Sequence, residues 1–268
     1  IYIGSASRNE KNDYFGYMKK MLLTLHNVYM INHAGLPIHG AMVNIVLKND
    51  KEKNIVVIGD SGAGKSETLE ALRIIGGSYI KEMRIIFDDM GTFLLDESNK
   101  MYAIGTEIGA FIRLDDLENG YAYREIDRAF FLNPDKINAR VILPVASYQT
   151  IMKRQKIDMV FYANNYVDEE KGIEFFHNVE DALQVFRDGA RKAKGTTSEI
   201  GLVKSYFANP FGPVQREAET EKLLVEYFKH LFDANVPIGE IYTRLAVPGF
   251  ELKGPQLAAR KLLEHLIK

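Results

Sequence analysis

The chain has 268 residues, of which 46% are hydrophobic, so it is long enough to bury one large core. Its formal net charge of −2 does not favour a nucleic-acid partner, and the absence of cysteine excludes disulfides and thiolate metal sites. No apolar run approaches a membrane span in length, and the first residues do not resemble a secretory leader, so we predict a cytoplasmic protein that does not contact the membrane.

The first third of the chain alternates between helical and strand patterns. Apolar residues at helical spacing predict a helix over 14–28. A Gly-Leu-Pro break follows, and residues 38–47 then read as a strand. The polar run 48–53 predicts a hairpin turn into a buried strand over 55–58. These elements lead directly into a glycine-rich segment.

Beyond that segment the patterns continue to mix strands and helices. Residues 115–137 follow neither pattern. The remaining predicted elements are a helix over 68–75, an apolar strand over 83–87, short strands at 92–95, 101–104 and 110–114, strands at 140–144 and 157–162, and helices at 179–193, 217–232 and 255–267. One α/β domain over 1–268, with a mixed β-sheet and flanking helices, is the simplest assembly of these elements.

The glycine-rich segment after residue 58 fits the pattern G-x-x-x-x-G-K-[ST]. Its glycines let backbone amides converge on a phosphate, and the following helix directs its positive end at the anion. Lys65 adds a charge for the outer phosphates, and Ser66 offers a hydroxyl to Mg²⁺. The pattern predicts a nucleotide site, with ATP or another nucleoside triphosphate bound by Gly59, Asp60, Ser61, Gly62, Ala63, Gly64, Lys65, Ser66 and Glu67.

Two adjacent carboxylates, Asp88 and Asp89, follow the apolar run 83–87. We expect this run to form a strand beside the strand that carries the loop, which would bring the carboxylates to the phosphates as metal ligands. Burying both is unfavourable unless cations offset them. An exposed turn after a strand is the simpler alternative.

Two further features have a structural and a functional interpretation. Lys19 and Lys20 lie side by side in the predicted first helix, where a solvated helix face would also explain them. His39 follows Leu36-Pro37-Ile38 and is, taken alone, more typical of a structural histidine than of a metal ligand.

The order of these motifs resembles phosphoenolpyruvate carboxykinase of the ATP-dependent class. The family's Tyr-x-Gly-Glu-Met-Lys-Lys-Gly is similar to residues 14–21, its Leu-Pro-Met-His to 36–39, and its Gly-Asp-Asp-Glu-His to 87–90. Later segments at 138–144, 194–199 and 206–213 are similar to its Thr-Arg-Val-Ser-Tyr-Pro, Ala-Gly-Thr-Glu and Cys-Phe-Gly-Ala-Pro-Phe-x-Pro. The loop itself looks more like that of HPr kinase/phosphorylase, a relative with Gly-Asp-Ser-Gly-x-Gly-Lys-Ser-Glu-Thr.

The resemblance implies a P-loop domain of the carboxykinase type, which converts oxaloacetate and ATP to phosphoenolpyruvate, CO₂ and ADP. It implies Mn²⁺ ligation by Lys20, His39 and Asp88, and it places Ser66 and Asp89 at the nucleotide Mg²⁺. Catalytic roles would fall to Tyr14, Lys19, Lys20, Lys65 and Arg140, with Arg140 neutralising the phosphoryl group and Tyr14 and Lys19 facing the substrate.

This sequence also departs from the family pattern. Tyr17 and Met21 replace the Glu and Gly that flank the lysine pair, and the family's N-terminal domain, which supplies an arginine for the oxaloacetate carboxylate, is not in this chain. Two alternatives therefore stay open. One is a diverged kinase that phosphorylates a protein serine or a small hydroxyl compound, with Asp88 or Asp89 as base. The other is a regulatory module that binds ATP without turnover.

Overall fold

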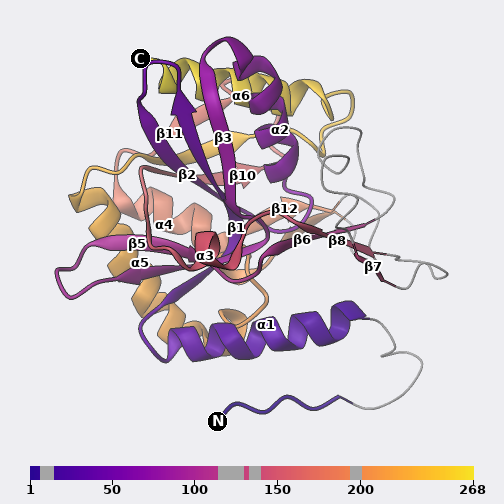
Figure 1. Ribbon diagram of the computed structural model, residues 1–268, viewed down its shortest axis with the longest axis vertical. Helices are drawn as coiled ribbons and strands as arrows, with labels where there is room; N and C mark the ends of the chain where they lie inside the picture. Colours follow the sequence, from indigo (N-terminus) through magenta and orange to yellow (C-terminus); the bar gives the residue numbers. More distant parts are fainter. Residues whose placement is uncertain (7–14, 114–129, 133–139, 194–200) are drawn as a thin grey trace.

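The computed structural model describes residues 1–6, 15–113, 130–132, 140–193 and 201–268 (Figure 1). Within these residues the main sheet has nine strands in the order β11-β14-β10-β2-β1-β4-β5-β9, and β3 also pairs with β1. The strands of this sheet are β1 (Leu36–Leu47), β2 (Glu52–Ile58), β3 (Ile80–Phe87), β4 (Met90–Leu95), β5 (Met101–Gly105), β9 (Gln155–Lys156), β10 (Met159–Asn164), β11 (Ile173–Phe175) and β14 (Ile238–Tyr242).

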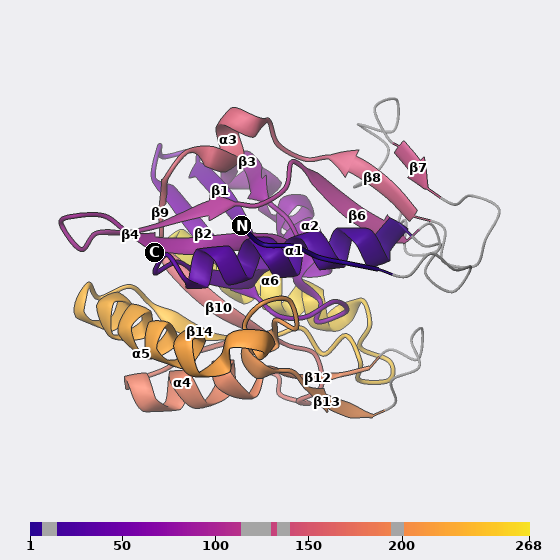
Figure 2. The same ribbon diagram turned by 90° about the horizontal axis from the view of Figure 1, so that it is seen from below.

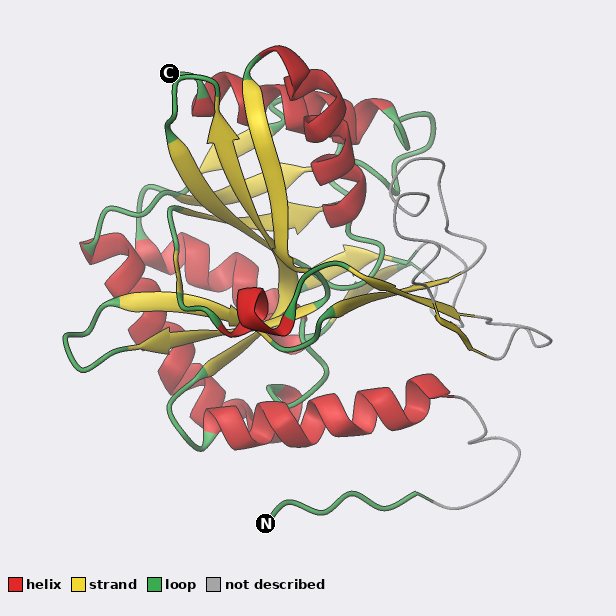
Figure 3. Ribbon diagram, in the orientation of Figure 1, coloured by secondary structure: helices red, strands yellow, loops and turns green. Residues whose placement is uncertain are grey.

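Helices and two smaller sheets surround the main sheet (Figure 3). The helices are α1 (Phe15–Ile31), α2 (Lys65–Ile75), α3 (Tyr148–Met152), α4 (Val179–Asp188), α5 (Glu217–Asp233) and α6 (Lys253–Leu266), with 3₁₀ turns η2 (Gly76–Ser78), η5 (Tyr206–Ala208) and η6 (Val214–Arg216). The smaller sheets contain β6 (Gly109–Arg113), β7 (Phe130–Leu132) and β8 (Arg140–Pro144), and β12 (Ala190–Lys192) and β13 (Leu202–Lys204).

The sheet is mixed because its centre is parallel and its flanks are antiparallel. β10 pairs in parallel with both β2 and β14, so the carboxyl ends of these three strands lie at one edge. β1 is antiparallel to β2, and its first residues, Leu36 to His39, pair with β4 while the rest pairs with β2 and β3. β1 therefore connects the parallel centre of the sheet to its antiparallel part.

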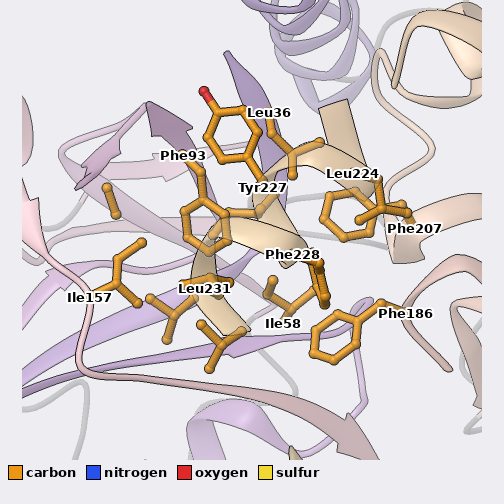
Figure 4. Close-up of a cluster of buried hydrophobic side chains, with 14 of the residues drawn as sticks. Leu36, Ile58, Phe93, Ile157, Phe186, Phe207, Leu224, Tyr227, Phe228 and Leu231 are labelled. Carbon is orange, nitrogen blue, oxygen red and sulfur yellow. The ribbon is translucent and has the colours of Figure 1, made fainter. Parts of the chain in front are cut away.

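Both faces of the sheet are covered by helices, with α2 and α6 on one side and α4 and α5 on the other (Figures 1 and 2). Successive strand residues point to opposite faces, so β2 contributes to two cores. Ile55 and Val57 pack with Leu72 and Leu262 of α2 and α6. Val56 and Ile58 belong to a second cluster with α4 and α5 (Figure 4), whose members include Phe186, Leu224 and Phe228. The near-continuous apolar run in β2 follows from burial on both faces.

Most of the predicted elements are present, with ends that shift by a few residues. Two expectations were wrong. The helix predicted over 179–193 ends at Asp188, because Gly189 adopts φ +53 and closes it; residues 190–192 then form β12. The run ending at Phe87 does not pair with the loop strand β2, because β1 lies between them.

Among the described residues, no helix combines the length and apolar character needed to cross a membrane. The cytoplasmic location stays a prediction.

Candidate functional site

The glycine-rich loop joins β2 to α2 in the order that the motif predicts. Gly64 precedes α2 with φ +90, a left-handed conformation that suits glycine. A Cβ at this position would also lie 2.5 Å from Oγ1 of Thr243. The backbone amides of Gly62, Gly64 and Lys65 donate to no protein acceptor within the described part of the chain. The loop thus presents donors at a helix N-terminus, which is an arrangement that binds anions.

Lys65 lies inside this loop. Its side chain is buried, and its ammonium donates to the carbonyl oxygens of Gly59 at 2.6 Å and Asp60 at 3.1 Å. Both partners are neutral carbonyls rather than carboxylates, so neither competes electrostatically with a phosphate that enters the loop. Ser66, one residue further, is exposed at the start of α2.

The ends of the two neighbouring parallel strands support the loop from behind. After β10, the buried amide of Asn165 donates to the carbonyl of Gly62 at 2.9 Å and also to that of Lys192. After β14, the hydroxyl of Thr243 donates to the carbonyl of Ala63 at 2.7 Å. Parallel pairing of β2, β10 and β14 is what brings these residues to one edge. The loop is therefore held in its open shape by side chains from distant parts of the sequence.

A chain of charged side chains lies next to the loop. His39 in β1 is buried, and its Nε2 lies 3.1 Å from Oδ1 of Asp89. The other carboxylate oxygen of Asp89 accepts from the Lys19 ammonium at 2.7 Å. The β-sheet places this pair, since the amide of Gly40 donates to the carbonyl of Asp89 and the amide of Gly59 donates to that of His39. His39 and Asp89 thus sit against the first residue of the loop.

The second nitrogen of His39 points towards the loop itself. Nδ1 donates to the carbonyl of Ala208 at 3.1 Å and lies 3.4 Å from Oδ1 of Asp60. A carbonyl oxygen only accepts hydrogen bonds, so Nδ1 is the donor in its contact with Ala208. The other oxygen of Asp60 accepts from Nε of Arg191 at 2.7 Å.

These contacts set the ionisation of the acidic groups. Burial opposes ionisation of Asp89, but Lys19 and His39 more than offset it and hold its pKa well below the usual value. Burial likewise opposes ionisation of Asp60, and His39, Arg191 and the Ser61 amide still lower its pKa. For Lys19, burial favours the neutral form, yet Asp89 and Glu107 raise its pKa. Both aspartates and Lys19 are therefore charged near neutral pH.

Glu107 is the exception among these carboxylates. Its Oε1 lies 3.2 Å from the ammonium of Lys19. Burial raises the pKa of Glu107 to about 7, with Lys19 opposing and Asp89 reinforcing the shift. A carboxyl group that titrates near neutral pH beside a lysine is a common feature of functional sites.

The structure distinguishes between neighbouring candidates. Asp89 contacts both His39 and Lys19 and has a positive φ of 93°. Asp88, one residue before it, is partly exposed like Asp89. Lys19 contacts Asp89, whereas Lys20 is exposed with its ammonium 6.0 Å from the centre of the Phe211 ring. The ligand set of Lys20, His39 and Asp88 stays a prediction, and the structure brings Lys19, His39 and Asp89 together instead.

The remaining predicted positions differ in how much of them the structure describes. Tyr14 lies outside the described residues, as do residues 194–199. Arg140 begins β8, but its side chain is not described. Glu67 is partly buried in the first turn of α2.

Sequence reasoning missed four residues of this site. Asn165 and Thr243 follow the apolar runs of β10 and β14, so a search for polar residues directly after buried strands would have found them. No comparable signal marks Arg191 or Glu107, whose roles depend on contacts with Asp60 and Lys19.

No protein-family model matches this chain, and no curated protein matches it. The functional argument therefore rests on the residues of the site.

Proposed function

We propose that this chain binds a nucleoside triphosphate at the glycine-rich loop and transfers its terminal phosphoryl group. The observation that carries the proposal is that one loop, at the start of α2, contains both the buried Lys65 ammonium and backbone amides that donate to no described protein acceptor. Amide donors at a helix N-terminus and a lysine are the groups that hold the phosphates of a nucleotide. Thr243 and Asn165 pre-form the loop, so little ordering is needed when the phosphates bind.

The specific reaction that we propose is that of a carboxykinase, with oxaloacetate and ATP as substrates. The bond between the carboxylate and the methylene carbon of oxaloacetate breaks and CO₂ leaves, and its electron pair forms an enolate. The enolate oxygen then attacks the terminal phosphorus, and the bond to ADP breaks. The products are phosphoenolpyruvate, CO₂ and ADP. Such chemistry needs positive charge near both the enolate and the phosphoryl group.

Lys19 and Lys65 are the described cations that meet this need. Lys65 would neutralise the transferred phosphoryl group. The Lys19 ammonium, kept protonated by Asp89 and Glu107, would stabilise the developing enolate. Because both are largely buried, their charges would be less screened by water than those of surface lysines.

A divalent cation fits beside them. Among the described residues, no group of three or more His, Cys, Asp or Glu side chains is placed to hold a metal ion. Nevertheless, Nε2 of His39 and Oδ1 of Asp89 are 3.1 Å apart. Two neighbouring ligands of an octahedral ion at about 2.1 Å would be about 3 Å apart. We propose that this pair holds Mn²⁺ or Mg²⁺, with substrate and water completing the shell; when bound, the ion would supply charge for the enolate or the phosphates.

The test is a coupled assay with ADP, phosphoenolpyruvate, bicarbonate and Mn²⁺, in which oxaloacetate is measured as it forms. We expect turnover by this chain or by a longer natural form of it. Lys19→Ala and His39→Ala should lower turnover at least a hundredfold, while Lys171→Ala, an exposed lysine paired with Glu174, should leave it unchanged. Nucleotide binding without oxaloacetate formation in either form would contradict the carboxykinase reaction but not the nucleotide site.

Nucleotide binding is tested separately by titration with Mg-ATP. Lys65→Ala should weaken it at least tenfold, because the variant removes the only lysine of the loop. Equal affinity in Lys65→Ala and in the Lys171→Ala control would refute the nucleotide site.

A second candidate is a kinase that acts on a protein serine or a small hydroxyl compound. The residues of the loop, Gly-Asp-Ser-Gly-Ala-Gly-Lys-Ser-Glu-Thr, favour it. Its base would have to be Asp88, since a carboxylate held ionised by Lys19 and His39 is a weak proton acceptor. Transfer of labelled phosphate from ATP to a hydroxyl acceptor without oxaloacetate would favour this kinase. ATP binding with no ADP release under any condition would instead indicate a regulatory module.

A further inference from the structure

A large open cavity lies at the opposite end of the parallel strands from the glycine-rich loop. Its volume is about 1050 Å³, and it is lined by the starts of β2, β10 and β14, the ends of α5 and α6, and the turn between β4 and β5. β2 runs from Glu52 in the cavity to Ile58 before the loop, and six residues of strand span about 20 Å. The cavity is therefore separate from the proposed nucleotide site.

The floor of the cavity is apolar. Ile157 and Met159 come from the start of β10, Leu231 from α5 and Leu266 from α6, and each is buried in the protein. A surface of this kind gains free energy when an apolar group covers it, at about 25 cal/mol for each Å² removed from water. The floor thus favours a ligand with an apolar part.

The rim is cationic because five lysines line the cavity (Lys51, Lys53, Lys100, Lys156 and Lys268) against two acidic residues (Glu52 and Asp158). Lys51, Lys53 and Lys100 line the cavity and form no ion pair with any described carboxylate. The two acidic residues of the lining have other hydrogen-bond partners, and they are outnumbered by the lysines. Glu52 accepts from the amide of Asn44 at 2.7 Å, and Asp158 accepts from the backbone amide of Asn54 and from Lys156.

The pKa of His265 is sensitive to the positive charges of the rim. Its ring packs against Phe175, with 4.7 Å between the ring centres, and it lines the same cavity. Burial lowers the pKa of His265, and the charges of Lys268 and Lys53 lower it further. Two separate lysines thus act on one point of the wall, as expected where positive charges converge.

We propose that this cavity is a second binding site, which takes an anionic small molecule with an apolar part and two or more negative charges. The floor would cover the apolar part, and Lys51, Lys53 and Lys100 would contact the anionic groups. Anions of this class include aryl and acyl phosphates and dicarboxylates with a hydrocarbon body. The proposal does not depend on the reaction proposed for the glycine-rich loop.

The probe for the test is 4,4′-dianilino-1,1′-binaphthyl-5,5′-disulfonate, an apolar dye with two sulfonates, titrated by fluorescence in saturating Mg-ATP so that the nucleotide site is occupied. We expect one saturable site per chain. The triple variant Lys51→Gln, Lys53→Gln, Lys100→Gln should raise its Kd about tenfold, as three lost charges at roughly 8 Å predict. A control triple, Lys81→Gln, Lys171→Gln, Lys261→Gln, changes the net charge equally at exposed lysines outside the cavity and should have little effect.

A second variant fills the cavity without changing its charge. Ala234 lies exposed on the wall at the end of α5, so Ala234→Trp should also raise the Kd at least tenfold. Far-ultraviolet circular dichroism of each variant verifies that it is folded. The proposal is refuted if the dye does not saturate, if both lysine triples weaken binding equally, or if Ala234→Trp leaves the Kd within twofold of the parent.

Discussion

Asp89 offers the sharpest test of the electrostatics beside the loop. Asp89→Asn removes the negative charge between Lys19 and His39 but keeps the size of the side chain. Asparagine also tolerates the positive φ of 93° at this position, so the backbone should not change. The substitution therefore isolates the charge.

The expected loss of stability follows from the two contacts. A hydrogen bond to a charged group contributes about 1.5–3 kcal/mol when it is well buried. The side chain of Asp89 is 34% exposed and that of Lys19 12%, so solvent screening reduces these values. We expect Asp89→Asn to lower the free energy of unfolding by about 2 kcal/mol at pH 7, measured by urea titration in metal-free buffer.

The contribution of Asp89 to the free energy of unfolding should depend on pH in a defined direction. The folded pKa of Asp89 is depressed, so its contribution is complete above the unfolded pKa of about 3.9 and is lost as the pH falls through the folded value. The difference between the free energies of unfolding of parent and variant should narrow below pH 4, as Asp89 becomes protonated in the parent.

The chain contains a matched control. Asp50 pairs with Lys81 at the same 2.7 Å distance, but the side chains are 76% and 60% exposed. Asp50→Asn should leave the stability unchanged within error. If both substitutions have the same effect, or if the Asp89→Asn difference does not depend on pH, the assignment of a partly buried charge network is wrong.

Three further substitutions test the loop and its surroundings. Gly64→Ala should destabilise the fold by about 1–3 kcal/mol and weaken ATP binding, because the added Cβ meets Thr243 at φ +90, whereas Gly77→Ala, with open space around it, should be neutral. Asn165→Ala should cost about 2–3 kcal/mol in thermal or urea unfolding, because it leaves the carbonyls of Gly62 and Lys192 without their donor. Glu107→Gln should increase the free energy of unfolding more at pH 8 than at pH 5. The folded pKa of Glu107, about 7, lies above its unfolded pKa, so ionised Glu107 destabilises the fold as the pH rises between these two values. An effect of Glu107→Gln that does not depend on pH would contradict this expectation.

Local patterns were sufficient to predict most of the fold. Helical spacing predicted α1, α5 and α6, and the apolar runs predicted β1, β2 and β3, because burial of one stripe or of both strand faces leaves a period in the sequence. The glycine-rich loop was equally predictable, because its backbone geometry requires glycines at set positions. The end of α4 at Gly189 was missed, although the residue itself is a typical helix terminator.

The partners within the site depended on the tertiary structure. The resemblance assigned Lys20, His39 and Asp88 to Mn²⁺ and Lys19 to the substrate, and these roles stay predictions. The contacts of Asp89 with Lys19 and His39 were visible only in the tertiary structure. Lys19 and Lys20 are neighbours in α1, and Asp88 and Asp89 lie between β3 and β4. Their contacts therefore depend on how α1 packs and on the register of β1 with β4.

The support of the loop depended on topology in the same way. Asn165 and Thr243 lie 103 and 180 positions from the loop carbonyls that they hold, and they reach them because β10 pairs in parallel with both β2 and β14. The glycine-rich loop is formed by consecutive residues, so its backbone shape could be predicted from the sequence alone. The charge network and the cationic cavity arise from strands and helices that meet only in the folded chain, because pairing order and register are properties of the whole sheet.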